Sequence, residues 1–200
     1  MQLRYFNQPH FENGSLKLIS QVLKEHGISK PLICTDPGLV KIGMTDKIRN
    51  LISNELSPTF YTETPANPTE QAVNDALEMY KQNDCDGVVG FGGGSSMDLA
   101  KTVALMANHE GNVVDYSVNE GGTGKIKETV PTIAIPTTSG TGSEVSLGAV
   151  IIMNDGRKLI LASDHLVPNG AICDPELTLG LPPVLTAGAG MDALTHCIEA

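Results

Sequence analysis

Hydrophobic positions along the chain follow two alternating patterns. In the first, apolar residues recur three or four positions apart, as Leu16, Ile19, Val22 and Leu23 do before Gly27, and this spacing predicts an amphipathic helix. The same pattern predicts further helices over residues 48–56, 68–82 and 95–107, and the composition turns helical again beyond residues 181–183.

In the second pattern, short continuous apolar runs are bounded by glycine, proline or aspartate, as buried strands are. These runs predict strands at residues 3–6, 32–34, 59–61, 87–91, 130–135 and 171–174, and a hairpin over 147–162 that turns at Asp155 and Gly156. Residues 111–128 are polar, rich in glycine and without period, so we expect a surface excursion there.

Strands that alternate with helices predict the α/β class: a mostly parallel, doubly wound (Rossmann-like) sheet with helices on both faces. Strand signals cease near residue 180. We therefore expect an α/β domain over residues 1–180 and the beginning of an all-helical domain over residues 181–200, where the sequence stops.

Composition narrows the classes of partner. Lys and Arg number 13 against 23 Asp and Glu, which gives a net charge of −10, and no basic cluster is long enough to follow a nucleic acid backbone. The four cysteines form no CxxC pair, which favours reduced thiols in a cytoplasmic protein. No apolar run approaches the roughly 20 residues of a membrane span, and the start lacks the apolar core of a secretory signal. We expect neither a nucleic acid nor a membrane partner.

Three unusual stretches each follow a predicted strand: Asp36, residues 92–95 and residues 137–143. Parallel sheets bind ligands at the carboxyl edge of their strands, so this topology would gather the three stretches along one crevice. The expected ligand is a nucleotide, and the α/β domain is predicted to bind it.

The stretch GGGSSMDLAK, residues 92–101, joins a predicted strand to a helix. Gly93 and Gly94 would let the backbone approach a pyrophosphate, and the helix start offers unpaired N–H groups. Two other interpretations stay open: a simple tight turn, and a capping box made by Ser95 and Asp98. The stretch also departs from the usual dinucleotide fingerprint, because Ser95 stands where the last glycine should be.

Asp36 and the loop PTTSGTGSE supply the polar groups around that turn. Asp36 would accept hydrogen bonds from an adenosine ribose and repel a 2′-phosphate, which favours NAD over NADP; a turn aspartate before Pro37 is equally consistent. The loop, although it would also serve as a solvated connection, is rich in small hydroxyl donors that can line a nucleotide. Those hydroxyls belong to Thr137, Thr138, Ser139 and Thr141, and Lys158 follows on the predicted hairpin, where it would reach an anionic ligand or face water.

Asp192 and His196 lie four positions apart in the last predicted helix, so their side chains share one face. A carboxylate and an imidazole suit a divalent ion such as iron or zinc, but two ligands cannot hold one firmly. The alternative is that Asp192 caps the helix and His196 packs or faces water.

Taken in order, GGGSSMDLAK, PTTSGTGSEVS and AGAGMDALTHCIEA resemble the iron-containing (group III) alcohol dehydrogenases. The resemblance also includes TDPGL at 35–39, NPT at 67–69 and DPELT at 174–178. It implies an α/β domain that binds a nicotinamide cofactor, an all-helical domain that completes a metal site, and an active site in the cleft between them. It also implies that the sequence is the first part of a longer enzyme. These 200 residues alone would then have negligible turnover.

The resemblance assigns a role to each candidate residue. The pyrophosphate would lie on Gly93, Gly94 and Ser95, and the ribose at Asp36. Two of four metal ligands would be Asp192 and His196, with two histidines from later helices completing the set. Further cofactor contacts would come from Thr137, Thr138 and Thr141, and less firmly from Asn67 and Lys158.

The implied activity is NAD-dependent, metal-dependent hydride transfer between a small alcohol or aldehyde and the nicotinamide, with Fe²⁺ as the expected ion and Zn²⁺ as the alternative. Two other interpretations remain: a relative similar to glycerol dehydrogenases or to the metal-free maleylacetate reductases, and a non-catalytic nucleotide-binding or assembly module. The resemblance further implies a dimer formed through residues 3–6.

Overall fold

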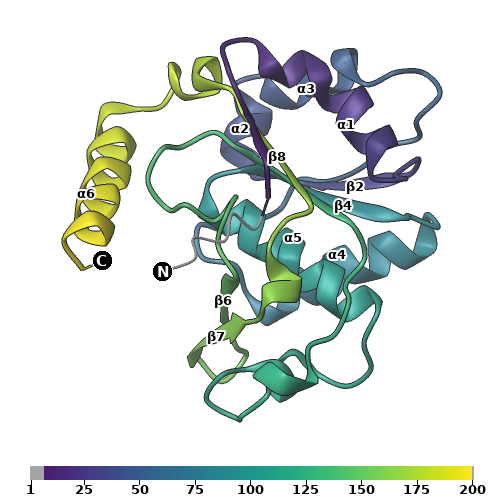
Figure 1. Ribbon diagram of the computed structural model, residues 1–200, viewed down its shortest axis with the longest axis vertical. Helices are drawn as coiled ribbons and strands as arrows, with labels where there is room; N and C mark the ends of the chain where they lie inside the picture. The colour runs from purple at the N-terminus through teal and green to yellow at the C-terminus, as the bar shows by residue number, and fades with distance from the viewer. Residues whose placement is uncertain (1–6, 200) are drawn as a thin grey trace.

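The computed structural model describes residues 7–199, and its centre is a six-stranded parallel sheet (Figure 1). Its strands lie in the order β1-β8-β5-β4-β2-β3, and every neighbouring pair is parallel. The strands are β1 (Pro9–Phe11), β2 (Pro31–Cys34), β3 (Thr59–Tyr61), β4 (Gly87–Gly92), β5 (Thr132–Pro136) and β8 (Gly170–Cys173). The expected α/β class with a parallel, Rossmann-like sheet is therefore confirmed.

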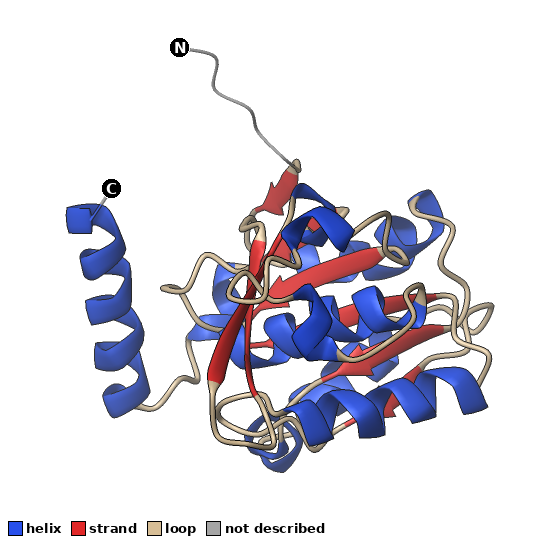
Figure 2. Cartoon of the chain, turned by 90° about the horizontal axis from the view of Figure 1, so that it is seen from below, coloured by secondary structure: helices blue, strands red, loops and turns tan. Residues whose placement is uncertain are grey.

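Six α-helices accompany the sheet in the described part of the chain: α1 (Ile19–Glu25), α2 (Pro37–Lys41), α3 (Met44–Leu51), α4 (Glu70–Gln82), α5 (Gly94–Ala107) and α6 (Pro183–Glu199). Figure 2 shows the strands between two layers of helices. No helix among residues 7–199 is both long enough and apolar enough to cross a membrane.

Two hydrophobic cores lie on opposite faces of the sheet because successive side chains of a strand point to opposite sides. In β4, Val88 packs with α4 and α5, whereas Val89 and Phe91 pack with α1 and α3. All three side chains are fully buried. The continuous apolar run of this strand thus fills both cores at once.

Helix α5 lies tightly against the sheet. A Cβ atom added at Gly90 in β4 would come within 2.8 Å of the Cα atom of Met97 in α5. Glycine is therefore required at Gly90, and the close contact fixes where α5 begins relative to the carboxyl edge of β4.

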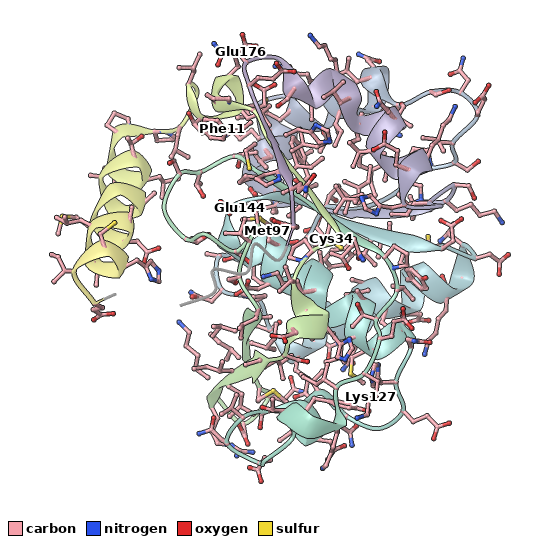
Figure 3. The ribbon with its side chains drawn as sticks, in the orientation of Figure 1. Phe11, Cys34, Met97, Lys127, Glu144 and Glu176 are labelled. Atoms are coloured by element: carbon pink, nitrogen blue, oxygen red, sulfur yellow. The ribbon has the colours of Figure 1, made fainter. Side chains whose placement is uncertain are left out.

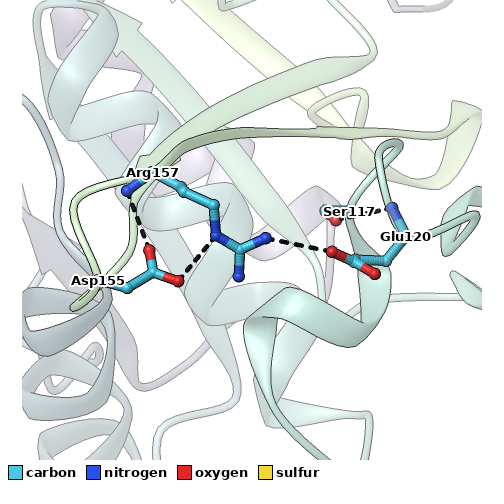
Figure 4. Close-up of polar contacts among 4 residues, drawn as sticks. All are labelled: Ser117, Glu120, Asp155 and Arg157. Atoms are coloured by element: carbon cyan, nitrogen blue, oxygen red, sulfur yellow. Dashed lines mark hydrogen bonds and ion pairs between the residues drawn. The ribbon is translucent and has the colours of Figure 1, made fainter.

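The predicted hairpin is confirmed as the two-stranded antiparallel sheet of β6 (Gly148–Ile152) and β7 (Lys158–Ala162), with Asp155 and Gly156 in its turn. Arg157 next to this turn contacts two carboxylates. Its Nε donates to Asp155 Oδ2 at 2.7 Å and its Nη1 to Glu120 Oε1 at 3.2 Å (Figure 4).

Glu120 belongs to the stretch 111–128, which is mostly exposed, as the expected surface excursion would be, but is also anchored to the body of the molecule. The 3-10 helices η2 (Val113–Tyr116) and η3 (Thr123–Lys125) occur within it, and Val113, Tyr116 and Ile126 are buried. The stretch packs against the hairpin, since Val118 N donates to Ile160 O at 2.8 Å. A few apolar side chains without period were sufficient to dock it.

Helix α6 differs from every other long helix because it has no buried side chain. Figure 1 shows it beside the body of the molecule, and Figure 3 shows its side chains projecting into open space. Its exposed apolar residues include Val184, Met191 and Ile198, which are 82%, 61% and 75% exposed. The predicted helix beyond residue 183 is confirmed, while the division into two domains at residue 180 stays a prediction.

Three further 3-10 helices join these elements: η1 (Ser15–Leu18), η4 (Asp164–Leu166) and η5 (Pro175–Thr178). The predicted strand at 3–6 lies outside the described residues. Strand β1 was not expected, and it pairs with β8 from the far end of the domain. Asp174 supports this pairing, because its carboxylate accepts hydrogen bonds from Gly14 N at 2.9 Å and Leu16 N at 3.1 Å.

Candidate functional site: a groove between helices α5 and α6

The three stretches singled out in the sequence lie at one edge of the sheet. The pairing register sets Cys34 of β2 opposite Gly90 of β4, and Gly92 of β4 opposite Pro136 of β5. Asp36, the glycine turn after β4 and the hydroxyl loop after β5 therefore leave the sheet side by side at its carboxyl edge.

The glycine turn leads directly into α5 without a side-chain cap. Gly92 has a φ of +152°, and Gly93 is the N-cap residue in an extended conformation, with no side-chain hydrogen bond to the helix start. The capping-box interpretation is wrong, because the Ser95 Oγ donates instead to Ala66 O at 2.6 Å and the Asp98 carboxylate binds elsewhere. The first turn of α5 thus keeps N–H groups and a positive dipole end that suit an anion.

The hydroxyl loop lies directly against this turn. A Cβ atom at Gly94 would come within 2.8 Å of Thr141 Cγ2, and one at Gly93 would lie 3.5 Å from Thr138 Cγ2. The Thr138 Oγ1 atom is buried and has no hydrogen-bond partner among residues 7–199. A buried hydroxyl without a partner is costly unless a ligand or water satisfies it. The two stretches therefore form one surface with an unfilled polar position.

Asp36 is a turn aspartate, as one of the two interpretations expected, and it also lies at the carboxyl edge of the sheet. Its Oδ1 accepts hydrogen bonds from Gly38 N at 2.9 Å and Leu39 N at 3.1 Å, and so caps α2. Its Oδ2 has no such partner in the described chain and lies 3.3 Å from the position of a Cβ atom at Gly92. One carboxylate oxygen therefore holds the helix, and the other lies beside the glycine turn.

A pocket of about 400 Å³, which we call the α5–α6 pocket, brings most of the predicted site residues together. Its lining comes from the loop before α4, the start of α5, the hydroxyl loop, the hairpin and α6. The predicted residues that line it are Asn67, Gly94, Ser95, Thr141, Lys158, Asp192 and His196, and it is completed by Pro68, Asp98, Ser143, Ser146, Gly148, Val150 and Ile152.

The remaining predicted residues lie outside this pocket. Thr138 lines a neighbouring cavity of about 440 Å³ together with Phe11 and Cys173. Thr137 is only 4% exposed, and its N–H donates to Gly92 O at 2.9 Å, so it extends the sheet pairing and its side chain lines neither cavity. Its hydroxyl is therefore not in position to contact a ligand in either cavity.

Asp192 and His196 face each other on α6, with His196 Nε2 3.6 Å from Asp192 Oδ2. Asp192 does not cap the helix, because α6 begins nine residues earlier at Pro183. His196 is not packed: its side chain is 62% exposed, which fits the water-facing form of the alternative. Within residues 7–199 no group of three or more His, Cys, Asp or Glu side chains is placed to hold a metal ion. This pair can supply two ligands, and others must come from elsewhere.

Two charged residues of α5 that hold the pocket lining in place, Asp98 and Lys101, were not recognised as such in the sequence. Asp98 accepts hydrogen bonds from Ser143 Oγ at 2.7 Å and Val150 N at 3.0 Å, and its burial raises the pKa of the carboxyl group. Burial of Lys101 lowers the pKa of its ammonium group to about 8. The sequence did carry one signal for the buried lysine: Lys101 stands within the largely apolar stretch LAKTVALMA.

Comparison with known proteins identifies the family of the chain. The family model described as iron-containing alcohol dehydrogenase matches residues 7–175. The 4-hydroxybutyrate dehydrogenase of Cupriavidus necator is 48% identical over 196 residues, which are 98% of this chain and 51% of that relative.

Solved structures show the same fold. Sulfoacetaldehyde reductase from Bifidobacterium kashiwanohense, in complex with NAD⁺, is similar with a TM-score of 0.89 and 34% identity, over 100% of this chain and 53% of that one. NADH-dependent butanol dehydrogenase A from Thermotoga maritima gives a TM-score of 0.91 at 28% identity, over 100% and 50%. The chain spans about half the length of these proteins. The family match over most of its length shows that it belongs to the iron-containing alcohol dehydrogenases.

Proposed function

We propose that the chain is the dinucleotide-binding part of an NAD-dependent, metal-dependent alcohol dehydrogenase or aldehyde reductase. One observation carries the proposal: the uncapped start of α5 lies against a loop that holds a buried hydroxyl, Thr138 Oγ1, without a partner. The lack of side chains at Gly93 and Gly94 leaves room for a pyrophosphate there, with Thr141 beside it.

The proposed position of the pyrophosphate indicates where the two ends of the cofactor would lie. The adenosine ribose would lie at Asp36, whose Oδ2 is available to accept a hydroxyl hydrogen bond and would repel a 2′-phosphate, so NAD is preferred over NADP. The nicotinamide half would extend into the α5–α6 pocket, where Asn67 and Lys158 lie. Thr137 is not among the proposed cofactor contacts; it lies next to the glycine turn and has a structural role there.

Asp192 and His196 would hold the divalent ion, for which we propose Fe²⁺, with Zn²⁺ as the alternative. A carboxylate and an imidazole fit either ion. When bound, the metal polarises the oxygen of the alcohol or carbonyl and lowers the pKa of the alcohol. The chain's own residues bind and orient the dinucleotide at the mouth of the same pocket.

The proposed substrate is a small alcohol or aldehyde. A hydroxy acid such as 4-hydroxybutyrate is a specific candidate, because the relative named for it is 48% identical and because Lys158 places a positive charge in the pocket. A cytoplasmic location and a dimer formed through residues 3–6 also belong to the proposal. All four cysteines are free thiols, which fits a reducing compartment.

Titration calorimetry of the 200-residue chain with NAD and NADP tests the proposal. We expect NAD to bind more tightly than NADP, and Gly94→Val to weaken NAD binding by about a hundredfold or more, which is roughly 2.7 kcal/mol. The reason is the contact of 2.8 Å that a Cβ atom at Gly94 would make with Thr141.

Gly188→Val is the matched control, because a Cβ atom at Gly188 in exposed α6 would meet nothing within 4 Å. NAD binding that is absent from the unmodified chain, or equal in both variants, would contradict the proposal. NAD binding with no metal binding and no activity after addition of Fe²⁺ would leave the non-catalytic module as the better description of this chain.

A further inference from the structure

Lys101 is a buried cation on α5 that the proposed cofactor contacts do not use. Its side chain is only 1% exposed, yet its Nζ donates to Ser146 O at 3.0 Å, Ser146 Oγ at 3.1 Å and Gly148 O at 2.9 Å. Three acceptors match the three protons of an ammonium group. All three acceptors are neutral, so the charge is placed where it fixes a segment of backbone.

That segment, residues 143–150, forms one side of the α5–α6 pocket, and we call it the wall segment. Asp98 holds it at two further points, since Ser143 Oγ and Val150 N both donate to its carboxylate. Asp98 and Lys101 lie one turn apart on α5. A single helix therefore supplies both the glycine turn at its start and the anchors of the wall segment.

The wall segment lines the same pocket as the proposed metal ligands, Asp192 and His196. Hydride transfer requires the nicotinamide to lie beside the reacting carbon of the alcohol, and that carbon would lie near Asp192 and His196, the residues that would hold the metal. The nicotinamide half of the dinucleotide would therefore pass along the wall segment, whereas the adenosine half would lie toward Asp36.

We infer that Lys101 is a positioning residue that sets the wall segment for the nicotinamide half of the dinucleotide. The inference rests on the proposed function, since it needs that half to lie in the α5–α6 pocket. Loss of the ammonium group would remove the Lys101 donor from the carbonyls of Ser146 and Gly148. Among the described residues it would leave Gly148 O with only the longer hydrogen bond from Ser146 Oγ, at 3.3 Å, so the segment would relax into another arrangement. The adenosine side has no contact with Lys101 and would be unaffected.

The test compares the affinities of NAD and ADP for the chain with Lys101→Met. We expect the dissociation constant of NAD to rise about tenfold and that of ADP to change less than about twofold, because ADP lacks the nicotinamide half. Leu105→Ala is the matched control: it removes a fully buried apolar side chain from the same helix and leaves the polar contacts of Asp98 and Lys101 with the wall segment in place. It should lower stability and leave the ratio of the two affinities unchanged.

Equal weakening of both ligands by Lys101→Met, or no weakening of NAD, would overturn the inference. Hydrogen exchange separates this failure from failure of the proposed function. If the unmodified chain binds neither ligand, faster exchange of the wall-segment amides in Lys101→Met but not in Leu105→Ala still supports the role of Lys101, and unchanged exchange overturns it. Ser146→Ala removes one of the three acceptors of Lys101 and the hydroxyl that donates to Gly148 O, but keeps the ammonium group. It should shift both readouts in the same direction by less, so it replaces Lys101→Met if that variant does not fold.

Discussion

Helices α5 and α6 both line the α5–α6 pocket, yet they are opposite in character. Most side chains of α5 are buried, and it lies against β4 closely enough to require glycine at Gly90. In α6 no side chain is buried, and five of its large apolar residues are exposed: Val184, Leu185, Met191, Leu194 and Ile198. The proposed nucleotide contacts thus rest on packed structure, whereas the proposed metal ligands stand on a helix with almost no packing.

This difference indicates how the two halves of the site are fixed. The position of the glycine turn follows from the sheet itself, because α5 cannot shift without disturbing both β4 and the core. Helix α6 approaches the body at the hydroxyl loop, where a Cβ atom at Gly140 would come within 2.3 Å of Ala189 O. The dinucleotide surface should therefore be formed before any ligand is present, while the metal pair depends on what else packs on α6.

The largest expected contrast is in stability. Phe91 in β4 is fully buried, so Phe91→Ala should lower the free energy of unfolding by about 3–5 kcal/mol. Ile198 in α6 is 75% exposed, and Ile198→Ala should change that free energy by less than about 0.5 kcal/mol. Urea unfolding followed by circular dichroism measures both values. Similar losses in the two variants would mean that α6 is packed after all.

A smaller contrast concerns pH. Burial lowers the pKa of Lys101 to about 8, from an ordinary value of 10.5. Between these values the unfolded chain binds more protons than the folded chain, so the contribution of this group to stability rises with pH. The stability of the unmodified chain relative to Lys101→Met should therefore increase above pH 8, by up to about 1.4 kcal/mol per pH unit. Urea unfolding at pH 7.5 and 9.5 checks this, and parallel behaviour of the two proteins would contradict it.

The smallest effect is expected at the metal pair. Asp192 and His196 are about half exposed and make only a contact of 3.6 Å with each other, so replacing either with Ala should change stability by less than about 0.5 kcal/mol. We expect the pair to give the chain weak Zn²⁺ binding, and each replacement should abolish it. Calorimetric titration with Zn²⁺ measures this, and unchanged binding would remove the pair from the proposed metal site.

The sequence predicts the sheet well because its buried strands are continuous apolar runs. The run before the glycine turn coincides with β4, and the runs at 32–34 and 59–61 coincide with β2 and β3. Strand β1 was missed because its three residues, Pro9, His10 and Phe11, are not an apolar run and are positioned only by pairing with β8. Helix α2 was missed because five residues are too few to show a helical period.

The candidate site likewise has a part that local sequence patterns predict and a part that they do not. Glycines, hydroxyls and the Asp192–His196 spacing are local signals, and the structure places most of them around one pocket. The anchoring by Asp98 and Lys101 was not predictable, because their partners lie more than 40 positions away on the wall segment. Such contacts depend on tertiary packing, which no local pattern encodes.

The pairing of β1 with β8 has a consequence for how the protein is made. Pro9 pairs with Ala171, and Gly14 and Leu16 donate to the carboxylate of Asp174. A ribosome adding about 5–20 residues per second needs roughly 8–30 seconds to synthesise the intervening chain. During that time β1 has no strand to pair with. The nascent chain therefore carries an open sheet edge until β8 emerges from the exit tunnel.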